Sequence, residues 1–146
     1  MSDDELLLQD WLMTKDRIKH FDDIVVRIRI QGIPIATAIL AAGLISYQYT
    51  KEVIFFGISA PALVVLAGTL YIIPILALDL FHFKLLMIAV EHGKYIENLP
   101  QFKGKLQITT KLTGRWLTIF HIVFAIAIYV VILVAGLSLL ISFIYF

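Results

Sequence analysis

The sequence contains no cysteine, and only 16% of its 146 residues are charged. Without thiols the chain cannot form disulfides, bind iron–sulfur clusters, attach haem through sulfur or use a cysteine nucleophile. Soluble domains carry about 25% charged residues, so this composition argues against a soluble fold. The net charge of +1 gives no support for a nucleic-acid partner. Because a glycine-rich phosphate loop and a nucleophile elbow are also missing, we expect no enzyme, no metal and no cofactor.

Long apolar runs are what the sequence has instead. Hydrophobic residues make up 60% of the chain, and the runs 53–78 and 116–146 are uninterrupted by charge. Both exceed the roughly 20 residues that cross a bilayer as a helix. A third run, 30–48, is just long enough. The N-terminus is acidic where a signal peptide is basic, so we expect the first run to stay in the mature protein. The predicted fold is an all-α membrane protein with three transmembrane helices.

An amphipathic helix is predicted before the first span. Ser2 can cap it, and Glu5 can reach back to the cap. Apolar residues then recur at heptad spacing, interrupted by Thr14. The stripe consists of Leu7, Trp11, Ile18, Phe21, Val25 and Ile28. A stripe of this kind is too apolar for a solvated helix, so we expect it to bury against the 79–98 segment of the same chain or against a neighbouring subunit.

Prolines in the first two spans are expected to break or bend their helices. The motif QGIP, residues 31–34, is expected to break or kink the helix, because proline lacks an amide donor and collides with the preceding turn. Pro61 and Pro74 are expected inside the second span and bend it. The predicted segments are an amphipathic helix at 1–29, transmembrane helix 1 with its outer turn at 30–50, transmembrane helix 2 at 51–78, an amphipathic continuation of that helix at 79–99, a loop at 100–114 and transmembrane helix 3 at 115–146.

The positive charges predict the orientation of the spans. Placing Asp79 and Lys84 at mid-bilayer would cost roughly 2.5–3.5 kcal/mol each, so the second span is expected to end near Leu78. Eleven of the twelve Lys and Arg residues then lie on one side, and only Lys51 lies on the other. By the positive-inside rule, the N-terminus is cytoplasmic and the C-terminus is outside. A four-span alternative with a separate helix at 70–90 would invert the last span and bury polar groups.

A charge pair is predicted at the cytoplasmic boundary. Asp79 and His82 lie one helical turn apart there, and Arg27 and Arg29 close the N-terminal helix at the same boundary. A carboxylate is the natural partner of a guanidinium. We therefore expect Asp79 to pair with one of the arginines, within the subunit or across to its neighbour, and to couple the cytoplasmic helices to the spans.

Two histidine-based sites are weaker alternatives. His82 and His121 fall near the same leaflet and could supply two axial ligands to a b-type haem. His20, Asp22 and Asp23 could join Glu91 and His92 in a cation site, but their spacing matches no metal motif. A solvated face with salt bridges explains the second group better.

The segments RIKHFDDIVVRIRIQGIPIATAI (17–39) and LDLFHFKLLMIAVEHGKYIE (78–97) resemble small multi-pass bacterial inner-membrane proteins, the effector subunits of prokaryotic antiphage defence systems. The resemblance covers about half of the chain. It implies an oligomer in the inner membrane whose cytoplasmic helices receive a signal and whose spans then open a pore or perturb the bilayer. The sequence lacks the nucleotide-binding or protease-like sensor domain of many such effectors, so a soluble cytoplasmic partner could supply the signal.

Two functions are therefore predicted. The first is a homo-oligomeric, channel-like or membrane-disrupting effector. Three helices with so few polar groups cannot enclose a pathway alone, although small residues spaced four apart, Ala38 with Ala42 and Ser138 with Ser142, would let helices of several copies approach closely. The alternative is a membrane anchor or assembly subunit of a larger complex, which could bind haem through His82 and His121.

Overall fold

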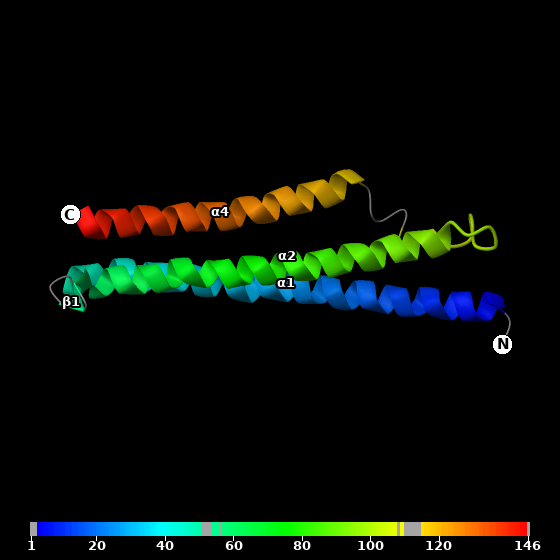
Figure 1. Cartoon of the computed structure of the whole chain (residues 1–146), viewed down its shortest axis with the longest axis horizontal. Helices are drawn as coiled ribbons and strands as arrows, with labels where there is room; N and C mark the ends of the chain where they lie inside the picture. The colour runs from blue at the N-terminus through cyan, green and yellow to red at the C-terminus, as the bar shows by residue number, and fades with distance from the viewer. Residues whose placement is uncertain (1–2, 51–53, 56, 108, 110–114, 146) are drawn as a thin grey trace. The chain divides into compact units, whose positions relative to one another are not determined.

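A computed structural model describes the backbone of residues 3–50, 54, 55, 57–107, 109 and 115–145, and their side chains except at 115–119, 121, 144 and 145. Figure 1 shows the order of the elements. The three long helices are α1 (Asp3–Thr50), α2 (Ala60–Glu97) and α4 (Arg115–Tyr145), and two short strands are β1 (Ile54–Phe55) and β2 (Ile58–Ser59). The chain divides into two compact units. Unit 1 comprises Met1–Val26 and Asp79–Val123, and unit 2 comprises Arg27–Leu78 and Phe124–Phe146.

Helix α1 continues through the QGIP motif. Its first turn carries Asp3, Asp4 and Glu5, whose charges favour the positive end of the helix dipole. Of the two outcomes expected at Pro34, the break does not occur, because α1 is one helix of 48 residues with this proline inside it. The hydroxyl of Thr37 donates to the carbonyls of Ile33 and Pro34 at 3.1 and 3.0 Å. These are the usual bonds of a helical threonine to the carbonyls three and four residues before it.

A hairpin replaces the predicted start of the second span. Strands β1 and β2 pair antiparallel, with Phe55 opposite Ile58, and Gly57 between them has a φ of 79°. This left-handed conformation favours glycine. Helix α2 begins at Ala60, and the predicted start of this span at 51–53 lies outside the described residues. Pro61 lies in the first turn of α2, where its missing amide donor is not needed.

Helix α2 then extends beyond the apolar run. It includes Pro74 and runs without interruption to Glu97, so the separate helix of the four-span alternative is contradicted, and the predicted helical continuation of the second span is confirmed. The boundary between the two units lies between Leu78 and Asp79.

Unit 2 packs its helices through glycines. Its buried core consists of Ala36, Leu40, Val65, Ile72, Ile75, Tyr129 and Ile132. A Cβ at Gly43 would lie 2.5 Å from Val65 Cγ2, and a Cβ at Gly136 would collide with Thr69 Oγ1. Small residues permit such close approach between membrane helices. Ala38, Ala42, Ser138 and Ser142, which the sequence offers for contacts between several copies, are exposed in the single chain, and that role stays a prediction.

Unit 1 packs the start of α1 on the end of α2. Trp11 and Val25 of α1 are buried, as are Ala89, Val90 and Ile96 of α2. The two helices run antiparallel within this unit, because contacts join Thr14 to Gly93 and Trp11 to Glu97. The apolar stripe of the N-terminal helix thus meets the 79–98 segment of its own chain.

Candidate functional site: the Glu97 cluster

A buried carboxylate lies where α2 ends. The side chain of Glu97 is only 2% exposed. Its Oε1 accepts a hydrogen bond from the indole Nε1 of Trp11 at 3.3 Å and a second from the backbone amide of Thr109 at 2.7 Å. One oxygen atom therefore joins the start of α1, the end of α2 and the chain that leads toward α4.

The helical repeat explains how these groups meet. Trp11 belongs to the buried stripe of α1, and a buried indole N–H needs an acceptor. Glu97 follows Val90 and Gly93 at intervals of three and four, so all three residues share one face of α2. The carboxylate is therefore placed on the face that packs against α1.

Gly93 makes room for the rest of this arrangement. A Cβ at Gly93 would lie 3.2 Å from Thr109 Oγ1 and 3.5 Å from Thr14 Cγ2. Thr14, which interrupts the stripe in the sequence, is 1% exposed, and its hydroxyl has no hydrogen-bond partner among the residues that the structure describes. We call Trp11, Thr14, Gly93, Glu97 and Thr109 the Glu97 cluster.

Charged side chains surround the cluster at the surface. His92 Nε2 lies 3.0 Å from Asp10 Oδ2, with both side chains 46% exposed. The His92 ring also stacks on Tyr95. Lys15 Nζ lies 4.7 Å from the centroid of the Trp11 ring, within the range of a cation–π contact. Because these contacts face solvent, each contributes much less than the buried bonds of Glu97.

The geometry of the Glu97 cluster suits a structural contact that holds segments of the chain together better than it suits a reaction centre. The Glu97 carboxylate is enclosed and already accepts two hydrogen bonds. Across the described part of the chain, no three His, Cys, Asp or Glu side chains converge as metal ligands. His92, which the sequence placed in a cation group with His20, instead pairs with Asp10.

The residues of the predicted charge pair fall in different units. Asp79 is 1% exposed and His82 is half-buried, and both belong to unit 1. His82 makes an edge-on contact with Phe81 at 5.4 Å between ring centroids. In unit 2, Arg27 is exposed and Arg29 is half-buried. The pairing of Asp79 with an arginine stays a prediction. So does haem binding by His82 and His121, because the His121 side chain lies outside the described residues.

The predicted stripe is only partly enclosed within the chain. Trp11 and Val25 are buried. The half-buried members are Leu7, Ile18, Phe21 and Ile28. Packing against the same chain thus encloses two of the six members, while the role of the stripe in subunit assembly stays a prediction.

Sequence reasoning missed Glu97, Thr109 and the Asp10–His92 pair. Glu97 carries no motif that singles it out in the sequence. Two features of the sequence could have indicated this contact. Trp11 belongs to the apolar stripe and needs a hydrogen-bond acceptor when it is buried. Glu97 continues the helical spacing of Val90 and Gly93, which places its carboxylate on the same face of the helix. No local pattern marks the amide of Thr109, because its position depends on the preceding turn of chain.

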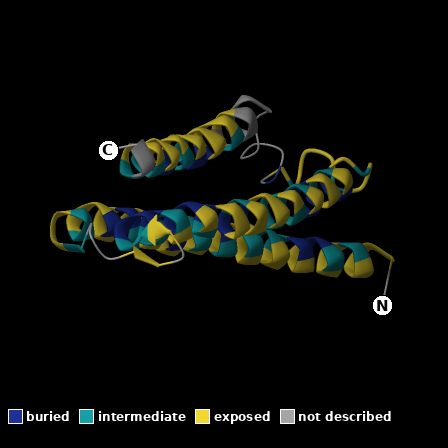
Figure 2. Cartoon of the chain, turned by 60° about the vertical axis from the view of Figure 1, so that its left-hand side comes forward, coloured by how far each residue is buried: buried dark blue, intermediate teal, exposed yellow. Residues whose placement is uncertain are grey.

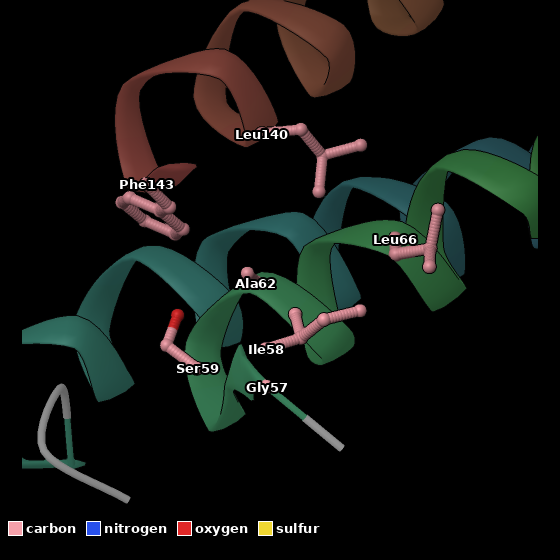
Figure 3. Close-up of a pocket in the computed structure, with 7 residues that line it drawn as sticks. All are labelled: Gly57, Ile58, Ser59, Ala62, Leu66, Leu140 and Phe143. Atoms are coloured by element: carbon pink, nitrogen blue, oxygen red, sulfur yellow. The ribbon is translucent and has the colours of Figure 1, made fainter. Parts of the chain in front are cut away.

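A pocket of about 390 Å³ lies in unit 2 beside the hairpin (Figure 3). It is lined by Gly57, Ile58, Ser59, Ala62, Leu66, Leu140 and Phe143. Phe143 also stacks on Tyr47, with 4.5 Å between ring centroids. Apart from the Ser59 hydroxyl the lining side chains are apolar, so the pocket suits hydrocarbon.

The described residues define a helical membrane protein. Three helical segments, Asp3–Thr50, Ala60–Glu97 and Ile122–Phe143, are long and apolar enough to cross a bilayer. Comparison of the chain with protein-family models, with curated proteins and with solved structures found no match in any of the three.

Proposed function

We propose that the protein is a homo-oligomeric membrane protein that acts as a channel-like or membrane-disrupting effector, controlled through unit 1. The observation that carries the proposal is the small share of each span that one chain buries: 22% for the first and third spans and 33% for the second. One copy leaves most of each span for lipid or for other copies. A polar pathway thus requires several copies around a common axis.

The Glu97 cluster supports control through unit 1. Helices α1 and α2 each begin or end in unit 1 and continue without interruption into unit 2. A signal that breaks the hydrogen bonds of Glu97 with Trp11 and Thr109 would therefore act on α1 and α2, which also form two of the spans. In this proposal the signal comes from a soluble partner or from the cytoplasmic helices themselves, and the effector belongs to an antiphage defence system.

The proposed location is the inner membrane of a bacterium, with the N-terminus in the cytoplasm and the C-terminus outside. Its support is the placing of eleven of twelve Lys and Arg residues on one side of the spans. The exposed apolar residues of unit 2, such as Leu44, Ile73 and Val131, would then face lipid or other copies.

Purified protein in liposomes that contain dyes of graded size tests this function. We expect dye release that rises with the fraction of oligomer and changes in Glu97→Ala, while Asp22→Ala, which removes an exposed acid of α1 in unit 1, behaves as wild type. Liposomes that stay tight at every protein density would contradict the proposal. A preparation with a haem absorbance band that is lost in His82→Ala or His121→Ala would support the anchor subunit instead.

A further inference from the structure

The pocket of unit 2 lies between matching faces of α2 and α4. Residues spaced four and three apart share one face of a helix. The two faces hold Ala62, Leu66 and Thr69 on α2 and Gly136, Leu140 and Phe143 on α4. A Cβ added at Gly136 would collide with the Thr69 side chain, so the faces touch at this level. The pocket therefore lies between this contact and the hairpin.

The same contact sets the levels of the lining residues. The two faces run antiparallel, because the pocket takes its lining from the start of α2 and the end of α4. One turn from the contact toward the hairpin, Leu140 lies level with Leu66 to within one residue, and a further turn brings Phe143 level with Ala62. Figure 3 shows the α4 side chains on one side of the pocket and those of α2 on the other. The lining thus follows the helix axes for about 10 Å from the hairpin.

The hairpin end of the pocket is expected at a membrane interface. The third candidate span ends at Phe143, whose ring stacks on Tyr47, and the nearby Tyr49 is 80% exposed. Tyrosine is enriched where hydrocarbon meets lipid headgroups. The ester carbonyls of phospholipids lie at that border, and their acyl chains run inward from it. Exposed residues run along α4 in Figure 2, so lipid has access to this helix.

Ser59 is the polar member of the lining. Its hydroxyl is shielded from solvent and has no hydrogen-bond partner among the residues that the structure describes. A serine directly before the first helical residue normally accepts a bond from the amide two or three positions on. Here the first of these positions is Pro61, which has no amide, and the bond to the second is not made. A buried hydroxyl without a partner is costly, so an acceptor in the pocket would be favoured.

We propose that the pocket binds one acyl chain of a bilayer phospholipid and that the Ser59 hydroxyl donates a hydrogen bond to the ester carbonyl of that chain. The hydroxyl reaches the carbonyl by a turn about the Cα–Cβ bond of Ser59, whose side chain lines the pocket. The first methylene groups then lie beside Ala62 and Phe143, and the next ones lie beside Leu66 and Leu140.

The size and charge of the pocket fit this occupant. A volume of about 390 Å³ is near the lower end of the range for ligand pockets, so it suits one hydrocarbon chain and not a whole lipid. The lining carries no charge, so the headgroup stays outside at the interface. The site needs a single copy of the chain and therefore does not depend on the proposed function.

Two other occupants fit less well. A free fatty acid would bring a charged carboxylate to a lining without a basic side chain, where its desolvation is not offset. An apolar side chain from a second copy would fill the space but leave the Ser59 hydroxyl without an acceptor. A hydrocarbon chain that begins at a neutral carbonyl meets both requirements.

Native mass spectrometry of the delipidated full chain in detergent, titrated with a diacyl phosphatidylglycerol, tests the site. We expect Leu140→Trp, which fills the inner part of the pocket, to weaken binding of the first lipid at least tenfold. Ile141→Trp is the matched control and should bind as wild type, because Ile141 is 58% exposed and points to a different side of α4. Ser59→Ala should bind about two- to tenfold more weakly, the effect of one hydrogen bond.

The dialkyl ether analogue of the same lipid isolates the carbonyl. It keeps the headgroup and both chains, so wild type should bind it about as weakly as Ser59→Ala binds the diacyl lipid. Ser59→Ala should bind the two lipids alike, because the hydroxyl and the carbonyl act as a pair. In detergent without lipid, Ser59→Ala should melt at the same temperature as wild type, since its hydroxyl has no partner to lose among the described residues.

Several results would overturn the proposal. Equal lipid binding by Leu140→Trp and Ile141→Trp would place the lipid elsewhere, and a Ser59→Ala variant that still prefers the diacyl lipid would remove the hydroxyl from the site. A lower melting temperature of Ser59→Ala without lipid would show that the hydroxyl caps α2. Tighter binding of a free fatty acid than of the diacyl lipid would identify the wrong occupant. If Leu140→Trp does not fold, Ser59→Ala and the ether lipid still decide the question, and none of these results depends on dye release.

Discussion

The indole of Trp11 donates a hydrogen bond to the carboxylate of Glu97 across 86 positions of sequence. The same oxygen accepts the amide of Thr109 at 2.7 Å. A buried acceptor shared by two buried donors is costly to remove, because both donors lose their partner together.

Glu97→Ala should therefore destabilise unit 1 strongly. We expect a loss on the order of 3 kcal/mol, since two buried N–H groups are left unsatisfied. Trp11→Phe keeps the ring and removes one donor, so its loss should be smaller, about 1–2 kcal/mol. Thermal melting in detergent measures both changes. A Glu97→Ala variant that melts like Glu91→Ala would show that the cluster does not stabilise the unit.

The surface pair of Asp10 and His92 should contribute little. Both side chains are 46% exposed, so solvent screens their attraction. A double-mutant cycle with Asp10→Asn and His92→Ala should give a coupling free energy of less than about 1 kcal/mol that disappears in high salt. A larger, salt-resistant coupling would mean that the pair is enclosed in the assembled protein.

Gly43→Ala should loosen the packing of α1 on α2 within unit 2. The added Cβ would lie 2.5 Å from Val65 Cγ2 and 3.2 Å from the Val65 backbone nitrogen, which cannot rotate away. We expect a loss of about 1–3 kcal/mol from overpacking. The nearby Ala41 is exposed, so Ala41→Val is the control and should leave the melting temperature nearly unchanged.

Asp79→Ala should impair both stability and function. This carboxylate is 1% exposed, and a buried charge persists only where partners offset its desolvation. Removing one member of a buried pair costs on the order of 3–5 kcal/mol. A charge swap that exchanges Asp79 with Arg27 or Arg29 should recover part of the loss if the predicted pairing is right. Recovery with neither arginine would rule the pairing out, and Arg17→Ala, which removes an exposed charge of unit 1, serves as control.

The orientation of the spans can be measured with topology reporters. A reporter that is active only outside the cytoplasm should work when it is fused after residue 146 or inserted at 47–52, and it should fail at 101–110. The reason is the eleven-to-one distribution of Lys and Arg. Activity at 101–110 would contradict the predicted orientation.

Apolar run length predicted the all-helical fold and its three candidate spans, because each span is a property of local composition. The hairpin was missed because residues 53–58 are apolar, and only Gly57 among them argues against a helix. The break at Pro34 was overestimated because proline is tolerated inside helices that are long, apolar and packed against neighbours. Glu97 was missed for a different reason: its partners come from distant parts of the chain, and no local spacing reveals them.

Residues of α1 and α2 that contact each other differ in how far apart they lie in the sequence, and this separation affects the order in which the contacts form. Contacts close to the hairpin, such as Gly43 with Val65, join segments that are near in sequence, whereas Trp11 and Glu97 are the ends of a much longer loop. Loop closure costs more entropy as the loop grows, so pairing should begin beside the hairpin and proceed outward. The Trp11–Glu97 bond is then the last to form, after the ribosome has made Thr109 as well. It is also the first to open when the pair frays from its free end, which makes it the natural point at which a signal separates the two helices.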